Sequence, residues 1–130
     1  MPADRVVVTA IVTSEHGVLL CRRRDGKPEI SLPGGEWEDG ESAEECAIRE
    51  TAEETGLTVT VGPVLGERIH PRTGRRMIYY PALPVGDDTR IKVGDPDEHS
   101  EVMWVAWPDA ADLLPGLFEP VRTHLEHVFG

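Results

Sequence analysis

The chain has 130 residues, 39% of them hydrophobic and 28% charged, which suits one globular domain over residues 1–130. Its net charge of −11 does not suit a nucleic-acid polymer as partner, because proteins bind phosphates with clustered Lys and Arg. No apolar run reaches the ~18 residues of a membrane span. Residues 1–5 lack the order of a signal peptide, and the two cysteines are expected to be free core thiols. We therefore expect a cytoplasmic protein without a membrane segment.

The negative charge is concentrated in one stretch of the sequence. Residues 36–54 contain nine acidic residues and one basic residue, a net charge of −8, whereas the rest of the chain has a net charge of −3. An acidic excess usually serves solubility. One that is this local calls for a separate explanation.

Paired strands are predicted at the start of the chain. The β-branched segment 6–12 is expected to be a strand buried on both faces. A turn at 15–17 returns the chain as a partner strand at 18–22. Residues 30–32 form a further short extended segment, which leads into the glycines at 34 and 35.

A helix is predicted over about 42–55. Ser42 and Glu45 have the spacing of a capping box, and Gly56 is suited to end the helix. The face that we expect to pack closely on a sheet consists of small residues, namely Ala43, Cys46, Ala47, Thr51 and Ala52.

The second half of the chain predicts more strands and two more helices. Extended segments are expected at 58–61, 64–70, 76–83 and 102–106, with a hairpin turn at 71–74 and a loop at 95–98. A short helix is predicted at 108–114. The final segment has the stripe of an amphipathic helix, formed by Leu117, Val121, Leu125 and Val128. Together these elements predict an α/β domain with helices layered on a mixed sheet.

Three glutamates of the predicted helix share one face. Glu50, Glu53 and Glu54 are three and four residues apart, and Glu41 can close their patch from the N-terminal side. In a partly buried site, two like charges ~4 Å apart cost about 4 kcal/mol, which a hard divalent cation removes. Oxygen ligands suit Mg²⁺ or Mn²⁺, and the absence of nearby His and Cys argues against zinc. The alternative is a solvated acidic face.

Two features favour the metal over the solvated face. The glutamates lie in the C-terminal half of the helix, where the helix dipole disfavours anions. Arg49, the single base of the stretch, lies directly beside Glu50 as an orienting partner. Glu45, four residues earlier, can compete for this arginine.

The segment from Gly35 to Leu57 resembles the Nudix box, whose pattern is Gly-x5-Glu-x7-Arg-Glu-apolar-x-Glu-Glu-x-Gly-apolar. Thr51 stands where an aliphatic residue is usual, which we interpret as a packing variation. The order of elements around the box also resembles a Nudix domain across nearly the whole chain. All seven fixed positions hold the residues of the pattern, namely Gly35, Glu41, Arg49, Glu50, Glu53, Glu54 and Gly56.

The resemblance implies a Nudix-like α/β/α sandwich with a mixed β-sheet and a hydrolase that depends on Mg²⁺ or Mn²⁺. By analogy, Glu53 and Glu54 coordinate the metal and the Gly35 carbonyl assists. Glu50 is either a further ligand or the general base. Arg49 is expected to hold the carboxylates of the box by ion pairing.

In some members of the family a further ligand or the base lies on a distal loop. Glu98 is our candidate for that catalytic role, and Glu101 is the second choice. Each is otherwise an ordinary solvated acid.

Substrate contacts are predicted on two strands. Alternation sends Arg22 and Arg24 to one face, where they either bind phosphates or are surface charges. Tyr79 and Tyr80 either stack on a base or belong to the core.

The resemblance implies a small nucleotide as substrate, cleaved at a pyrophosphate bond. We favour a nucleoside triphosphate, modified or not, which gives a mononucleotide and pyrophosphate. The alternative is ADP-ribose or a nucleotide sugar, because Pro71 lies near a position where ADP-ribose members often carry proline. A third hypothesis is a nucleotide-binding regulator without activity. The sequence leaves a homodimer open and does not define the role of Trp37.

Overall fold

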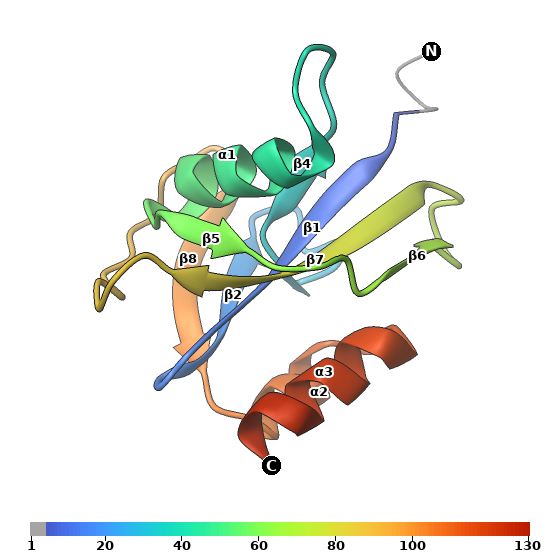
Figure 1. Ribbon diagram of the computed structural model, residues 1–130. Helices are drawn as coiled ribbons and strands as arrows, with labels where there is room; N and C mark the ends of the chain where they lie inside the picture. Colours follow the sequence, from blue (N-terminus) through green and yellow to red (C-terminus); the bar gives the residue numbers. More distant parts are fainter. Residues whose placement is uncertain (1–4) are drawn as a thin grey trace.

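The computed structural model describes residues 5–130 (Figure 1). Residues 1–4, on which the prediction about a signal peptide rests in part, lie outside the described residues. The elements in chain order are β1 (Val7–Ser14), β2 (Gly17–Arg23), β3 (Ile30–Ser31), β4 (Gly34–Glu36), α1 (Ala43–Thr55), β5 (Val59–Val61), β6 (Gly66–Ile69), β7 (Arg76–Pro84), β8 (His99–Val105), α2 (Asp109–Leu113) and α3 (Glu119–Phe129).

Strand β1 is the centre of a mixed sheet. It pairs parallel with β7 and antiparallel with β2 and β4, which take opposite ends of the strand. Strands β5 and β6 pair with β7, while β3 and β8 flank β2. This arrangement brings β4, which leads into α1, beside the start of β1.

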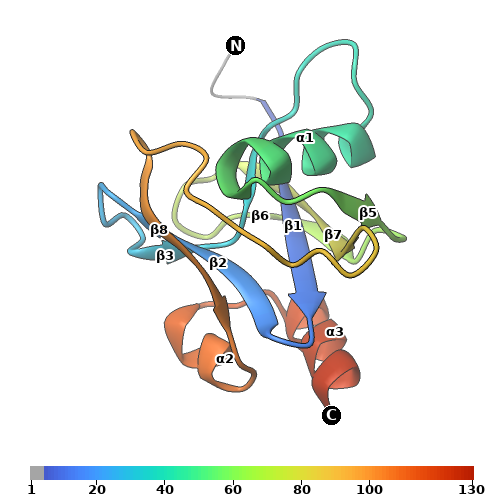
Figure 2. The same ribbon diagram turned by 90° about the vertical axis from the view of Figure 1, so that its left-hand side faces the viewer.

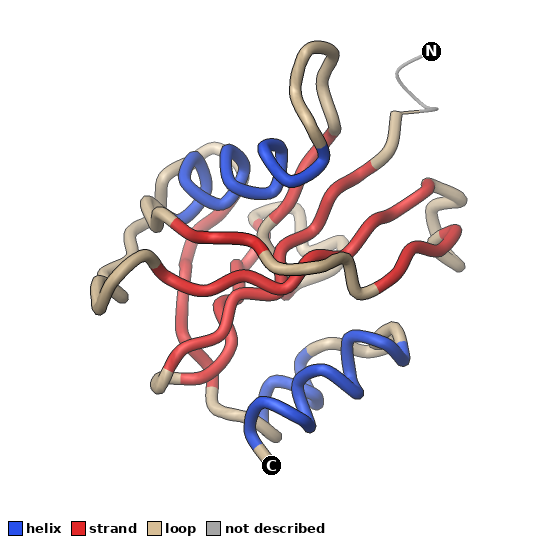
Figure 3. The backbone as a smooth tube through the Cα atoms, in the orientation of Figure 1, coloured by secondary structure: helices blue, strands red, loops and turns tan. Residues whose placement is uncertain are grey.

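Helices cover both faces of the sheet, as the tube view shows (Figure 3). Val8, Ala10 and Val12 of β1 belong to the core beneath α1, whereas Ile11 belongs to the core under α2 and α3. Side chains alternate across a strand, so a strand that is apolar on both faces serves both cores. The predicted α/β/α sandwich and the strand buried on both faces are confirmed.

The predicted helix over 42–55 is confirmed as α1, and so are both of its ends. The Ser42 side chain accepts a hydrogen bond from the backbone N–H of Glu45, and the Glu45 side chain accepts one from that of Ser42. Gly56 ends the helix with a left-handed φ of 73°, which favours glycine. One residue of the predicted small face is wrong, because Ala52 is exposed while the other four are buried.

The structure adds one strand that was not predicted and moves the start of another. β4 was not predicted, because two of its three residues are glycines and glycine has little strand propensity. β8 begins at His99 rather than at 102, and a bulge lies where Arg22 and Arg23 of β2 pair with Glu101 and His99. No helix of the described residues is long and apolar enough to cross a membrane.

Removal of the capping serine is expected to destabilise the fold. Ser42→Ala removes one acceptor at the start of α1 and should lower the free energy of unfolding by about 1 kcal/mol in urea denaturation. The matched control is Ser100→Ala, because Ser100 is an exposed serine of β8. A loss in the control as large as that in Ser42→Ala would contradict the capping role.

Candidate active site

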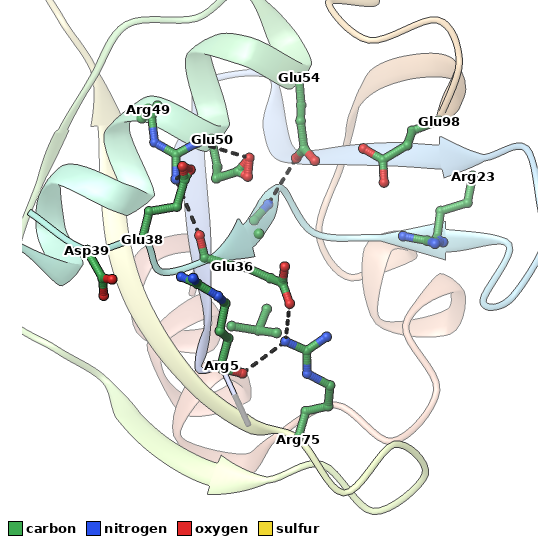
Figure 4. A pocket seen from close by; sticks show the side chains of 13 residues that line it. Arg5, Arg23, Glu36, Glu38, Asp39, Arg49, Glu50, Glu54, Arg75 and Glu98 are labelled. Carbon is green, nitrogen blue, oxygen red and sulfur yellow. Dashed lines mark hydrogen bonds and ion pairs between the residues drawn. The ribbon is translucent and has the colours of Figure 1, made fainter. Parts of the chain in front are cut away.

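A polar pocket of about 860 Å³ lies between α1, β4, the end of β2 and the loop before β8. That volume is in the range of small-molecule sites, about 300–1,000 Å³. Figure 4 shows Glu50 and Glu54 projecting into it from α1, with Glu98 and Arg23 nearby. The residues that line it are Arg5, Val7, Arg23, Gly34, Gly35, Glu36, Glu38, Asp39, Arg49, Glu50, Glu54 and Glu98, together with Arg75.

The two glycines of β4 allow the carboxylates to reach the backbone. A Cβ on Gly35 would stand 1.8 Å from Oε2 of Glu50, and one on Gly34 would stand 2.5 Å from the Val8 carbonyl oxygen. The Gly34 N–H donates a hydrogen bond to Oε1 of Glu54 at 3.0 Å. The strand therefore holds one carboxylate by a hydrogen bond and leaves room for the other.

Arg49 contacts several carboxylates of the acidic cluster. Its Nε and Nη2 donate to the two carboxylate oxygens of Glu41 at 3.0 and 2.8 Å, and its Nη1 donates to Glu53 at 2.8 Å. Nη1 also lies 3.6 Å from Oε1 of Glu50. The hydrogen bonds from Arg49 lower the pKa of Glu41 to about 2. Glu45, bound up in the capping box, does not compete for this arginine.

Glu50 and Glu54 accept no hydrogen bond from Arg49, and both have raised pKa values. Burial raises the pKa of Glu50 to about 7, although Arg49 opposes the shift. Burial also raises the pKa of Glu54 to about 8, and the charges of Glu50 and Glu98 add to the effect against the Gly34 hydrogen bond. Both carboxylates are therefore partly protonated near neutral pH.

The loop before β8 is fixed to the C-terminal end of α1 (Figure 2). Lys92 N–H donates to the Thr55 carbonyl at 2.9 Å and Gly94 N–H donates to the Glu54 carbonyl at 3.0 Å. A Cβ on Gly94 would stand 2.0 Å from the Glu53 carbonyl oxygen, so the close approach needs glycine. These bonds satisfy free carbonyls of the helix and bring the loop that carries Glu98 to the pocket.

The structure gathers most of the predicted catalytic and metal-binding residues in the pocket. Gly35, Arg49, Glu50, Glu54 and Glu98 all line it. The exception is Glu53. Its side chain is 53% exposed and is held by Arg49 outside the lining. Glu101 on β8, the second candidate for the distal base, pairs with Arg22 at 3.0 Å and also lies outside the pocket lining.

The structure does not bring the predicted substrate contacts to the pocket. Arg22 pairs with Glu29 and Glu101, and the Arg24 side chain donates to the Pro96 carbonyl. Both tyrosines are core residues instead, because Tyr79 is 3% and Tyr80 8% exposed, on opposite faces of β7.

Trp37 also packs on the core under α1, and its indole N–H donates to the Glu41 carbonyl at 2.8 Å. It thereby ties the loop that follows β4 to the residue held by Arg49. This contact gives the tryptophan a structural role that its polar neighbours in the sequence did not reveal.

Three arginines of the lining were missed from the sequence. Arg23 is on the same face of β2 as Leu19, which belongs to the core beneath α1, so alternation contained the signal. Arg5 and Arg75 come from the start of the described chain and from the turn before β7. Nothing in the local sequence places these two beside the box.

The α/β/α sandwich places carboxylates and arginines around one pocket. This combination suits a hydrolase that acts on anionic substrates. A family model described as NUDIX domain matches residues 3–127, so the chain belongs to the Nudix family. A MutT-like protein of Streptomyces ambofaciens is 32% identical over 95% of this chain and 85% of its own length.

Two further similarities agree with this family membership. A putative 8-oxo-dGTP diphosphatase of Bacillus subtilis is 30% identical over 74% of this chain and 62% of its own length. The crystal structure of a NUDIX hydrolase from Nitrosomonas europaea shares the fold, with a TM-score of 0.78 and 24% identity, over 95% of this chain and 71% of that one. The chain is therefore a Nudix pyrophosphohydrolase.

Stability of the metal-free protein should fall as the pH rises. The pKa of Glu54 is about 8 in the folded protein and 4.5 when unperturbed, so the folded protein binds more protons than the unfolded chain between these values. Glu54→Gln should reduce the loss of unfolding free energy between pH 5 and pH 8 by ~3 kcal/mol. Urea denaturation with EDTA at several pH values measures this.

The matched control for the pH dependence is Glu126→Gln, because Glu126 is an exposed glutamate of α3. Its stability should fall with pH as in the unsubstituted protein. A slope that Glu54→Gln leaves unchanged would show that burial of Glu54 does not couple folding to protonation.

Proposed function

We propose that the protein hydrolyses a nucleoside triphosphate, modified or not, to a mononucleotide and pyrophosphate, with Mg²⁺ or Mn²⁺ bound. The observation that carries this proposal is a pair of carboxylates, the buried Glu54 and the partly buried Glu50, on one wall of the pocket against the backbone of β4. The name of the Bacillus subtilis relative, a putative 8-oxo-dGTP diphosphatase, supports a nucleoside triphosphate as substrate.

The donors of this wall fit a hard divalent cation. Glu54 would offer the oxygen that the Gly34 N–H leaves free, and Gly35, which lines the pocket, would add its carbonyl oxygen as the family resemblance implies. Carboxylate and carbonyl oxygens are the ligands that Mg²⁺ prefers. Glu53 would join them only after release from Arg49. A bound cation would neutralise phosphate oxygens and lower the pKa of a coordinated water.

Glu50 is the residue that we assign as general base. Its pKa of about 7 lies near the working pH, where a base is most effective. Its carboxylate accepts the proton of the water that attacks phosphorus, and the bond from that phosphorus to the pyrophosphate oxygen breaks. Arg49, 3.6 Å away, holds the Glu50 carboxylate in place. Glu98 is the alternative base on the opposite side.

The arginines of the lining are assigned to the phosphates of the substrate. Arg75 donates through Nη2 to Glu36 at 2.7 Å, while its buried Nε has no partner among the described residues. Arg23 is oriented by a two-bond pair with Asp25 at 3.0 and 2.8 Å. A guanidinium that is already oriented binds phosphate at a smaller cost in conformational freedom.

A substrate panel tests the proposed reaction. With Mg²⁺, nucleoside triphosphates should give a mononucleotide and inorganic pyrophosphate, identified by mass spectrometry, and EDTA should abolish turnover. AMP and ribose 5-phosphate formed from ADP-ribose, with triphosphates untouched, would replace the triphosphate by the alternative substrate. Nucleotide binding without any hydrolysis would favour the regulator. Pro71, which prompted the ADP-ribose alternative, lies in the turn between β6 and β7, outside the lining.

Substitution of single glutamates ranks their roles. Glu54→Gln and Glu50→Gln should each lower kcat/KM by on the order of 10³, because one removes a metal ligand and the other the base. Glu53→Gln should lower it only about tenfold, because its side chain is half exposed and held by Arg49. Steady-state kinetics with saturating Mg²⁺ measures all three.

The matched control in these assays is again Glu126→Gln on α3, which should keep full activity. A loss at Glu53→Gln as large as that at Glu54→Gln would contradict this ranking. A loss of 10³ at Glu98→Gln with activity retained at Glu50→Gln would move the base to the distal loop.

A further inference from the structure

A second set of donors lies against the Glu54 wall of the pocket. Cys21 of β2, Glu54 of α1 and His99 at the start of β8 each place a donor atom within 4.8 Å of the other two. Their exposed fractions are 0%, 7% and 2%. These residues are far apart in the sequence, so only the folded sheet and helix create the cluster.

His99 supplies an independent sign of a ligand. Its Nδ1 is buried and has no hydrogen-bond partner among the described residues. A buried polar atom without a partner costs about 1–3 kcal/mol. Such atoms in native proteins call for an explanation, for which an ion is one of the standard candidates.

The chemistry of the three donors differs from that of the magnesium wall. A thiolate, an imidazole and a carboxylate together favour Zn²⁺ or Co²⁺ over Mg²⁺. In tetrahedral zinc, a sulfur at 2.3 Å and a nitrogen at 2.0 Å are about 3.5 Å apart, so small side-chain rotations suffice here. The thiolate and the carboxylate also balance the charge of the cation, which avoids burial of a net charge.

We propose that Cys21, Glu54 and His99 bind a thiophilic divalent cation such as Zn²⁺. The ion enters through the pocket, which Glu54 lines, and the thiol proton is released to solvent. Three protein ligands leave the fourth tetrahedral position for water.

Glu54 would then belong to two sites of different preference. The Gly34 N–H occupies one oxygen of Glu54, so both cations would compete for the other, and Zn²⁺ in this site should inhibit hydrolysis supported by Mg²⁺. This consequence rests on the proposed function, whereas the binding of the ion does not.

Cobalt spectroscopy on the full metal-free chain tests binding. Co²⁺ should produce a thiolate-to-cobalt charge-transfer band in the near ultraviolet, and equimolar Zn²⁺ should abolish it. Cys21→Ser should lose the band, while Cys46→Ser should keep it, because Cys46 is the other buried cysteine and is outside the cluster. His99→Gln should weaken Co²⁺ binding at least tenfold, with circular dichroism as the check on folding.

No band in the unsubstituted protein, or an equal band in Cys21→Ser, would overturn the proposed site. Inhibition is measured separately, as Zn²⁺ titrated into Mg²⁺-supported hydrolysis. Cys21→Ser should keep its basal activity and need at least tenfold more Zn²⁺ for half inhibition. Equal sensitivity of Cys21→Ser and the unsubstituted protein to Zn²⁺ would overturn the role of Glu54 as a shared ligand. If the protein hydrolyses none of the substrates, the cobalt spectrum still tests the binding site.

Discussion

The site depends on two carboxylates between α1 and the glycines of β4, namely the buried Glu54 and the partly buried Glu50. Burial is the largest cause that raises both pKa values, and nearby carboxylates add to it, so the arrangement is unfavourable while both groups are ionised. The surrounding contacts limit this cost without removing it. Arg49 donates hydrogen bonds to the carboxylates of Glu41 and Glu53 and only approaches Glu50, at 3.6 Å, and a single N–H from β4 reaches Glu54. The remaining electrostatic cost is what a divalent cation would offset.

Local sequence was sufficient wherever the determining contacts are local. The capping box, the glycine that ends α1 and the strand apolar on both faces all depend on neighbours within a few residues, and all were predicted. The spacing of the box predicted the shared helix face, and two of its three glutamates do reach the pocket. The third, Glu53, was assigned the same role by analogy. Its side chain is exposed because Arg49 holds it outside the pocket, and the spacing of the box does not determine where Arg49 lies.

The errors concern residues whose position relative to the pocket is determined by tertiary structure. Arg22 and Arg24 were assigned to the site because alternation gives a common face, but it does not say which face meets α1. Arg23 is on the face that does. The tyrosines of β7 are aromatic and amphipathic, so their types fit a base or a core equally well, and the central position of β7 made them core. The cluster of Cys21 and His99 beside the box follows only from the pairing of β2 with β8.

The most direct measurement of the central claim is the number of protons released when Mg²⁺ or Mn²⁺ binds. Isothermal titration calorimetry at pH 7 in buffers of different ionisation enthalpy gives that number as a slope. At this pH the carboxylate with a pKa of about 7 is half protonated and the one with a pKa of about 8 is mostly protonated, so binding that ionises both should release about 1.4 protons. Glu54→Gln should weaken binding and reduce the release. Tight binding without proton release, unchanged in Glu54→Gln, would show that the cation does not bind at Glu50 and Glu54.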